Sequence, residues 1–539
     1  MPLFPVLNSL SSMTSVLLLV SCLALYIVYY LRKKHSYWER RGVPCSKSIS
    51  LLFGNTKDLV LRRVPLAFVF QRIYSELDGH KFGGFYQMTK PALMIRDPEL
   101  IRNIFVKNFS YFHDRNAQKI EELSSFSPNL LNLTGQRWRN VRYKLTPAFS
   151  SGKLRAMQGL MQECISELAD YLNKALDDDC KNSMLNVREI MAKFTTDVIG
   201  ACAFGLNCNS IRDENSEFRR IGRIFTKTTL RMHIRNLLRT LSPTLTKLIG
   251  LGESNPEIVK FFWTVLKDTV RHRESNTHKR SDFLQLMLDI QAEEIKQKQN
   301  NNQDTVRNEI QNGFVENSVA SQEDILFTDS VVASNAFNFF IAGYETIAIT
   351  LSHCLYELAL HQGILMKLRD EVESVKQAHS KNLDYDAQKE LVYMDAVISE
   401  TLRKYPVASV TVRRCTETTQ LPNTSVVVEE GVNLFVSIYA LHHDPKYFPE
   451  PEKFKPERFI GENKDNIVPG SYLPFGDGPR ICIGMRFAMY EMKSVLSYIV
   501  SNYTIHTCEK TSIPLKYDPK PGLHTPYDVW VRFQKRVKS

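Results

Sequence analysis

The sequence predicts a mostly α-helical fold with a smaller β region, preceded by an N-terminal transmembrane helix. Apolar residues follow a helical period from residue 151 to 290 and again in two later segments. Short alternating runs near residues 84–95 and 529–533 are typical of strands. Before the first charged residue, Arg32, residues 13–31 form a mostly apolar stretch of about 19 residues, which can span a bilayer as a helix.

Composition and charge narrow the class of protein. With 539 residues and 43% hydrophobic content, the chain can bury a sizeable core. Its 10 cysteines are scattered without CxxC pairs, which argues for a reducing compartment and against a disulfide scaffold or a zinc ribbon. The net charge of +11 indicates an acidic partner, such as an anionic membrane or an acidic protein. The sequence contains no nucleic-acid-binding module, so we expect no nucleic-acid partner.

The apolar N-terminal stretch is predicted to be a retained membrane anchor. Arg32, Lys33 and Lys34 follow it, whereas a cleaved signal peptide, the alternative, carries its positive charge before its apolar residues. The positive-inside rule then places everything after residue 31 in the cytosol. We therefore predict an anchor with a polar hinge at residues 1–45 and one large domain at residues 46–539.

Local patterns predict the first elements of this domain. Residues 84–95 alternate around a turn at Thr89-Lys90 and indicate a β-hairpin. Asp97 provides an N-cap for the next helix, which has proline as its first residue. The polar run 296–322, rich in glutamine and asparagine, is predicted to be a disordered surface loop.

Residues 328–361 are predicted to form one long helix that is buried on most sides, because the stretch is mostly apolar. In its middle, residues 342–346 (AGYET) introduce a glycine and an acidic residue, each of which costs stability and needs a reason. One explanation is a helix kink in which Glu345 pairs with a distant base. The other is a functional site.

Residues 475–484 (FGDGPRICIG) form a glycine-rich loop that presents Cys482 just before a predicted helix at residues 485–503. A thiolate there is favoured by the positive end of the helix dipole and by nearby backbone N–H groups. Arg480, two residues before the sulfur, is placed to reach an anionic group on whatever the sulfur binds. The alternative is a buried structural cysteine in a glycine-rich turn.

A basic stripe recurs every four residues between residues 218 and 250, with apolar residues interleaved. Such a segment is predicted to lie on an anionic membrane surface, and the alternative is a helix pair with its bases in solvent. The members of the stripe are Arg219, Arg223, Lys227, Arg231, Arg235 and Arg239.

Together these motifs resemble those of the cytochrome P450 superfamily. Residues 475–484 match its cysteine-ligand signature, FGxGxRxCxG, at every fixed position, and residues 342–346 match its (A/G)Gx(D/E)T motif. Residues 36–44 (SYWERRGVP) and 196–210 look most like the microsomal, family six-like members of insects. The resemblance extends over nearly the whole chain and implies a cytochrome P450 fold, with the length of the 296–322 run as a departure.

The resemblance implies a haem-thiolate catalytic domain in which Cys482 is the metal ligand of haem b (heme b). Thr346 and Glu345 would be catalytic, with Thr346 bonding dioxygen and Glu345 feeding a proton relay. The other residues that the resemblance assigns to the cofactor are Arg115, Trp138, Arg142, Ala342, Gly343, Arg413, Phe475, Arg480 and Gly484.

Two pairs that share a helix face also gain a role from the resemblance. Glu400 and Arg403, three residues apart, would form a structural network with Arg458 of a downstream PERF motif. Trp138 and Arg142, four residues apart, would both donate to a haem propionate, a carboxylate that suits a bidentate guanidinium.

The implied activity is that of an NADPH- and O2-dependent monooxygenase, which inserts one oxygen atom into an apolar small molecule, either a xenobiotic or an endogenous lipid or hormone. The sequence has no GxGxxG after a strand and no Walker A motif, so electrons are expected from NADPH–cytochrome P450 reductase, with cytochrome b5 as a second donor. The expected location is the endoplasmic reticulum membrane, with the catalytic domain facing the cytosol. A peroxide-rearranging member of the family and a haem-thiolate gas sensor without turnover are the alternatives; the intact Glu345-Thr346 pair argues against the first.

Overall fold

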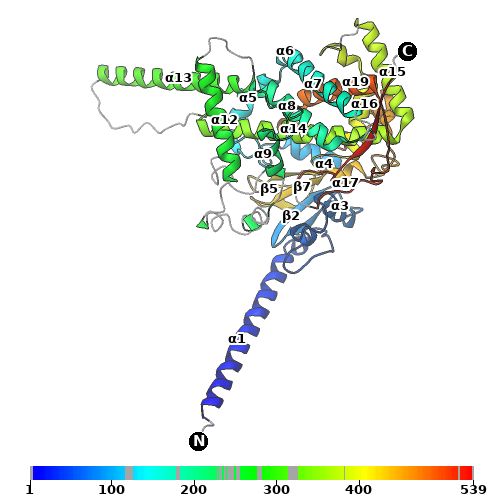
Figure 1. Cartoon of the computed structure of the whole chain (residues 1–539). Helices are drawn as coiled ribbons and strands as arrows, with labels where there is room; N and C mark the ends of the chain where they lie inside the picture. The colour runs from blue at the N-terminus through cyan, green and yellow to red at the C-terminus, as the bar shows by residue number, and fades with distance from the viewer. Residues whose placement is uncertain are drawn as a thin grey trace.

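The long helix α14 (Asp329–Leu360) runs through the middle of the protein, and other helices pack around it (Figure 1). Thr328 caps its N-terminus, because Thr328 Oγ1 accepts a hydrogen bond from Val331 N at 3.3 Å. The prediction of one long, mostly buried helix over residues 328–361 is confirmed. The mostly α-helical fold class with a smaller β region is confirmed as well.

The computed structural model describes residues 4–115, 126–177, 183–226, 229, 234–235, 238, 248–249, 255–275, 282–312, 326–380, 383–519 and 522–536. The other helices are α1 (Phe4–His35), α2 (Lys57–Val60), α3 (Leu66–Glu76), α4 (Pro98–Arg102), α5 (Gly135–Leu145), α6 (Ser151–Ala156), α7 (Gln158–Asp177), α8 (Val187–Ile199), α9 (Glu217–Thr226), α12 (Pro256–Ser275), α13 (Phe283–Asn312), α15 (Gln362–Ala378), α16 (Val392–Lys404), α17 (Ile438–His442), α18 (Gly461–Asp465) and α19 (Met485–Asn502). The strands are β1 (Phe82–Gln87), β2 (Lys90–Ile95), β3 (Met184–Asn186), β4 (Val410–Arg414), β5 (Thr419–Gln420), β6 (Val427–Val428), β7 (Asn433–Ser437), β8 (Tyr503–His506) and β9 (Trp530–Lys535).

The strands form small sheets beside the helices. The four-stranded sheet has the order β1-β2-β7-β4, in which β2 and β7 are parallel and the other pairs are antiparallel. The predicted hairpin is confirmed, but its turn comes one residue earlier, since Gln87 pairs with Lys90 and Met88 in the turn has a φ of 56°. In the second sheet, β3-β9-β8, Val531 and Phe533 of β9 are fully buried, as the C-terminal alternation predicts.

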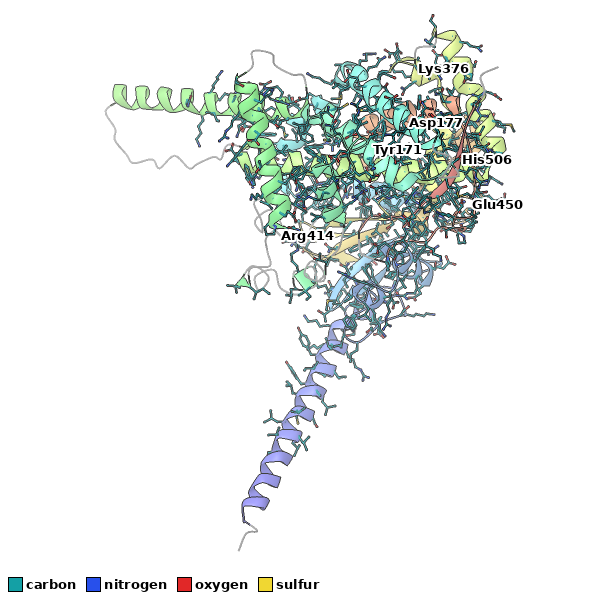
Figure 2. The ribbon with its side chains drawn as sticks, viewed as in Figure 1. Tyr171, Asp177, Lys376, Arg414, Glu450 and His506 are labelled. Carbon is teal, nitrogen blue, oxygen red and sulfur yellow. The ribbon has the colours of Figure 1, made fainter. Side chains whose placement is uncertain are left out.

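Helix α1 extends away from the rest of the protein, and its described side chains point into open space (Figure 2). Leu18 and Leu19 are 66% and 72% exposed. Among the described residues, one segment, Ser15–Arg41, is long and apolar enough to cross a membrane by length and composition, with a mean hydropathy of 1.9. The predicted N-terminal apolar helix is therefore present.

The segment predicted to be a polar hinge packs against the β1–β2 hairpin instead. Trp38 is fully buried, and its backbone N–H donates to Tyr86 Oη at 3.1 Å. Gly84 makes room for the indole, since a Cβ at this position would lie 2.4 Å from the ring. Arg41 pairs with Glu429 at 2.5 Å. Burial of the large Trp38 ring thus turns a polar stretch into a packed connection between α1 and the domain.

The prediction of a surface loop at residues 296–322 is wrong for its first part. Helix α13 continues to Asn312 and projects from the protein (Figure 1). Glutamine, lysine and glutamate are good helix formers even where no apolar face supports them. Gln297 Nε2 also donates to Glu293 Oε1, one turn earlier, at 3.3 Å. Residues 313–322 lie outside the described part of the chain.

The basic stripe is not one membrane-facing surface where the structure describes it. Arg219 is 5% exposed, and both Arg219 and Arg223 donate to Glu189 of α8, at 2.7 and 2.5 Å. Arg220, beside the stripe, pairs with Glu257 of α12. Sequence spacing does not reveal acidic residues on neighbouring helices, and here they bind the start of the stripe. Three members lie outside the described residues: Lys227, Arg231 and Arg239.

Two buried histidines, His353 of α14 and His524, stack with the half-buried Tyr517 ring. The ring of Tyr517 lies 5.9 Å from that of His353 and 3.9 Å from that of His524. Burial lowers the pKa of His353 to about 4 and that of His524 to about 3, so both are neutral in the folded protein. Because a histidine in an unfolded chain has a pKa of about 6.5, the unfolded state binds more protons between these values. The stability that these rings contribute is therefore complete above about pH 6.5 and is lost as the pH falls toward 4.

Replacing His353 with glutamine is expected to flatten this pH dependence. Because the pKa of His353 is lowered in the folded protein, the unfolding free energy of the wild type is expected to fall by about 2 kcal/mol when the pH is lowered from about 7.5 to about 5. Denaturant unfolding at the two pH values measures the loss, and His80→Gln, at an exposed position, is the control. An equal loss in His353→Gln and in the wild type would contradict the role of the buried ring.

Candidate functional site

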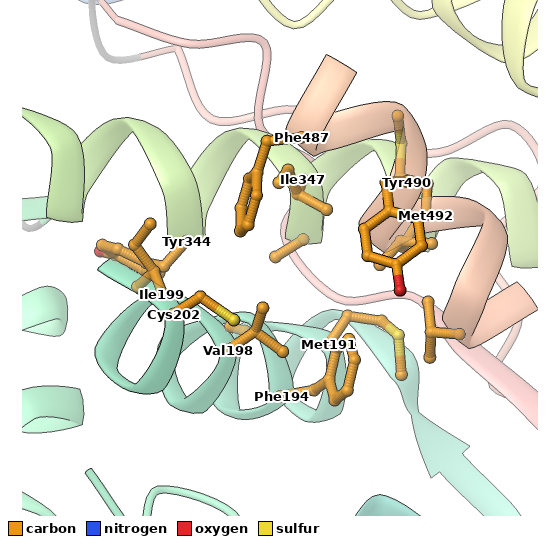
Figure 3. Packing of buried hydrophobic residues seen from close by; sticks show 14 of the residues in the cluster. Met191, Phe194, Val198, Ile199, Cys202, Tyr344, Ile347, Phe487, Tyr490 and Met492 are labelled. Carbon is orange, nitrogen blue, oxygen red and sulfur yellow. The ribbon is translucent and has the colours of Figure 1, made fainter. Parts of the chain in front are cut away.

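The predicted AGYET segment lies where α14 packs against α8 (Figure 3). Gly343 permits this contact, because a Cβ there would lie 2.5 Å from Ile199 Cδ1. The Tyr344 ring is buried, and its hydroxyl donates to Gly222 O of α9 at 2.9 Å. Packing between helices thus accounts for the glycine that the resemblance assigns to the cofactor.

Another face of α14 is open at the same level. Ala342 is exposed and Thr346 is partly exposed, in a helix that is otherwise largely buried. Thr346 Oγ1 donates to Ala342 O at 2.6 Å. Figure 3 shows Phe487 of α19 beside Ile347, so the helix that follows the cysteine loop packs on α14 next to the open face.

Glu345 has a partner that comes from α8. Its Oε1 accepts a hydrogen bond from Arg188 Nη2, and the two side chains are only 4% and 11% exposed. A buried carboxylate needs such a counter-ion. In the described part of the chain Glu345 and Thr346 therefore have separate partners, and the pairing of Glu345 with a distant base is present.

The cysteine loop is shaped by glycine and by a backbone hydrogen bond. Gly478 has a φ of 70°, and a Cβ there would lie 2.1 Å from Phe105 O, so a larger residue does not fit. Cys482 N donates to Phe475 O at 2.9 Å and closes the loop. The loop thus fixes the position of the Cys482 side chain just before α19 begins at Met485.

Polypeptide surrounds Cys482 on most sides, although its side chain is exposed to a local opening. Burial raises the pKa of the thiol, while the Gly484 N–H, Arg142 and Arg115 lower it. The expectation that local groups favour the thiolate is met only in part, since desolvation outweighs them. Bonding to a metal ion deprotonates a thiol in any case.

Arginine side chains gather around this loop. Arg480 lies over the Trp138 ring of α5, with its guanidinium carbon 4.1 Å from the ring centroid. Arg115 Nη2 donates to Arg480 O at 2.7 Å. Arg142, also on α5, lies close enough to act electrostatically on Arg115 and Arg480. Asp114 Oδ1 is 3.4 Å from Arg480 Nη2 and supplies negative charge.

This cluster holds more positive charge than Asp114 balances. Burial, and then Arg115, lowers the pKa of Arg480 to about 9. Arg413 of β4 is 1% exposed, and burial followed by Arg115 and Arg480 holds its pKa well below the usual range. Arg115 Nε, Arg413 Nε and Arg480 Nε and Nη1 are buried without a hydrogen-bond partner among the described residues. These donors fit a bound group that carries carboxylates.

Glu400 and Arg403 form a fully buried ion pair on α16. Arg403 Nε lies 2.7 Å from Glu400 Oε2 and Arg403 Nη2 lies 2.9 Å from Oε1, with both side chains 0% exposed. Arg458 Nε lies 3.4 Å from Glu400 Oε1, which also accepts from Lys455 N at 2.9 Å. The structure therefore brings all three residues of the predicted network together.

The geometry as a whole suits one class of protein. A thiol at the end of a glycine-rich loop is available to a metal, and the arginine donors that have no partner among the described residues are available to carboxylates. Helix α19, which follows the cysteine loop, packs on α14 through Phe487 and Ile347. A haem held by a cysteine thiolate has these requirements, so the fold and the site fit a haem-thiolate protein.

Comparison with known proteins identifies the family. Residues 51–528 match the family model described as Cytochrome P450. Probable cytochrome P450 6a14 of Drosophila melanogaster is 35% identical over 504 residues, which cover 92% of this chain and 94% of that protein. Cytochrome P450 6k1 of Blattella germanica is 35% identical over 513 residues (94% of each chain), and cytochrome P450 9e2 of the same species is 35% identical over 521 residues (94% and 95%).

The chain therefore belongs to the cytochrome P450 family, as its motifs predict. Membership implies a haem bound through a cysteine thiolate and monooxygenase activity. Members of the family generally take electrons from redox partners and bind hydrophobic substrates.

Proposed function

We propose that this protein is an NADPH- and O2-dependent monooxygenase of the endoplasmic reticulum membrane. It inserts one oxygen atom into an apolar small molecule, either a xenobiotic or an endogenous lipid or hormone. The cofactor would be haem b, and Cys482 would supply the thiolate that holds its iron. The observation that carries the proposal is the cluster of buried arginine donors beside the Cys482 loop that lack a hydrogen-bond partner in the part of the chain that the structure describes.

The residues around the loop hold and orient the cofactor in this proposal. Thiolate-bound haem supplies the oxygen-activating chemistry. The free donors of Arg115, Arg413 and Arg480, together with Arg142 and Trp138, would hold the propionate carboxylates. Because a guanidinium matches a carboxylate in two hydrogen bonds, these contacts fix orientation as well as charge. Carboxylates placed there also offset the mutual repulsion of the arginines, so each side stabilises the other.

Thr346 and Glu345 are the proposed proton path. The Thr346 hydroxyl lies on the open face of α14 and can turn from Ala342 O toward that space. Glu345 is anchored to Arg188, so a proton passes from its carboxyl to Thr346 only through a bridging water or after rotation of the side chain.

Helix α1 and the surface of α5 support the membrane and partner parts of the proposal. Helix α1 is long and apolar, and Arg32 and the bases that follow it support, by the positive-inside rule, a domain on the cytosolic side. Arg137 and Arg139 are exposed on α5, the helix that carries Trp138. Positive charge there suits an acidic surface of NADPH–cytochrome P450 reductase, with cytochrome b5 as a second donor.

Replacing Thr346 with alanine tests the reaction. Thr346→Ala removes a hydroxyl on the open face but no arginine donor, so haem content should stay at the wild-type level. The ratio of product formed to NADPH consumed, with reductase present, is expected to fall roughly tenfold or more, because a positioned proton donor is lost. Hydrogen peroxide should account for the lost product.

Thr350→Ala is the matched control. Thr350 lies one turn further along α14, is 4% exposed and makes the same kind of bond, from Oγ1 to Thr346 O at 2.9 Å. Its removal should leave the ratio unchanged. Equal ratios in Thr346→Ala and wild type would refute the role of Thr346. A wild-type protein that neither consumes NADPH nor forms product with reductase present would favour a gas sensor without turnover.

A further inference from the structure

We infer that His442 is a positioning residue through which the buried Glu400–Arg403 pair holds the cysteine loop in place. His442 is the last residue of α17 and is 0% exposed. The inference rests on the proposed role of Cys482 as the metal ligand. It adds a residue that neither the motifs nor the arginine cluster contain.

The two ring nitrogens of His442 bind two different segments. Nδ1 lies 3.2 Å from Arg403 O, and Nε2 accepts a hydrogen bond from Leu473 N at 2.9 Å. A carbonyl oxygen only accepts, so Nδ1 carries the proton and Nε2 is left as the acceptor. Arg403 Nη1 donates back to His442 O at 3.0 Å. The imidazole therefore connects the ion pair on α16 with the start of the loop.

Leu473 is the first residue of a short path to Cys482. Gly476 N donates to Leu473 O at 3.0 Å, which forms a turn over residues 473–476. Within that turn Phe475 O accepts from Cys482 N at 2.9 Å. Leu473 is 2% exposed, so without His442 its N–H would be left in the protein interior without an acceptor. A shift of this turn moves the backbone of Cys482 directly.

The surroundings keep His442 in the form that accepts. Burial, then the Arg403 guanidinium and His443, holds the pKa of His442 well below its usual range. A protonated ring would carry a hydrogen on Nε2, so two donors, Nε2–H and the Leu473 N–H, would face each other and the hydrogen bond would be lost. The Tyr472 ring stacks on the imidazole, with the ring centroids 5.2 Å apart. The Tyr472 hydroxyl donates to Ser399 O of α16 at 2.9 Å, which is a second contact between the segment that precedes the loop and α16.

The next residue, His443, offers a matched comparison. It is also buried, and burial lowers its pKa to about 4. Its Nδ1 lies 2.8 Å from Tyr439 O, and its ring stacks on Tyr439 at 4.1 Å. These contacts stay within one stretch of chain, so replacing His443 removes packing and a buried hydrogen bond without touching the loop.

The test follows the thiolate-type absorption of the reduced, carbon-monoxide-bound holoenzyme during incubation at a fixed temperature. His442→Leu is expected to lose this absorption roughly tenfold faster than His443→Leu at a comparable thermal midpoint, because the His442 change alone frees the turn. His442→Gln should slow the loss toward the wild-type rate, since a glutamine carbonyl can reach the place of Nε2. Hydrogen exchange of peptides covering residues 471–484 should rise in His442→Leu and not in His443→Leu.

Equal rates of loss in His442→Leu and His443→Leu would overturn the inference, as would a glutamine variant no slower than leucine. If His442→Leu yields no holoenzyme, His442→Asn replaces it, because an asparagine amide can donate to Arg403 O but does not reach Leu473. Asparagine must then lose the absorption faster than glutamine, and equal rates would overturn the inference. Wild-type protein without thiolate-type absorption would contradict the proposed function instead.

Discussion

Replacing Glu400 with leucine is expected to destabilise the protein by about 3–5 kcal/mol, because it leaves the Arg403 guanidinium buried without a counter-ion. Both side chains are 0% exposed, and Glu400 accepts two hydrogen bonds from Arg403, at 2.7 and 2.9 Å. Arg458 Nε loses its carboxylate partner in the same change. Since folded domains are typically stable by about 5–15 kcal/mol, little folded holoprotein should remain.

The yield of haem-containing protein and the thermal midpoint measure this effect. The double variant Glu400→Leu/Arg403→Met removes both charges and should recover part of the lost stability. Glu450→Gln, which breaks the exposed pairs with Lys453 and Lys455, is the control and should change little. Glu400→Leu as stable as this control, or a double variant no better than Glu400→Leu, would contradict a structural role for the pair.

Features that depend on neighbours in the chain could be predicted from the sequence. The apolar stretch at residues 328–361 is buried along α14, and Thr328 caps it as a threonine before a helix commonly does. The alternation at residues 529–533 places Val531 and Phe533 in the core. In the helix the abundance of apolar residues predicts burial on most sides, and in the strand their alternation predicts which face is buried.

Contacts between distant segments could not be predicted in this way. Glu345 forms an ion pair with Arg188, which lies 157 residues earlier and belongs to no recognised motif. The ring of Trp38 packs on Gly84, so a stretch of polar composition is not a hinge. Helix α13 shows a related limit, because low apolar content predicts an unsupported segment but not whether good helix formers make it helical.

The residues of the candidate site can be predicted mainly from the resemblance of the motifs to those of a known family. Spacing alone placed Cys482 and Arg480 in one loop, while Arg115 and Arg413 come from segments far apart in sequence. The structure adds the physical reason for their grouping, which is the set of buried donors that await carboxylates. It also adds His442, whose role depends on Leu473 and on the backbone of Arg403.

Replacing Cys482 with serine is expected to remove the thiolate-type absorption of the reduced, carbon-monoxide-bound protein completely. The loop can form with serine at position 482, because the hydrogen bond from the backbone N–H of residue 482 to Phe475 O does not involve the side chain. Serine cannot supply a thiolate to the metal, so the effect should be on the ligand and not on the fold. Cys415→Ser is the matched control, because Cys415 is a fully buried free cysteine that is not part of the loop and whose thiol donates to Glu417 O in its own segment at 3.0 Å.

The carbon-monoxide difference spectrum of these proteins tests the assignment of Cys482 most directly. The wild-type protein and Cys415→Ser should show the thiolate-type Soret band. Cys482→Ser should lack this band while keeping the far-ultraviolet circular dichroism of the wild type. A normal thiolate-type band in Cys482→Ser would contradict the assignment of Cys482 as the axial ligand and, with it, the proposed function of the site.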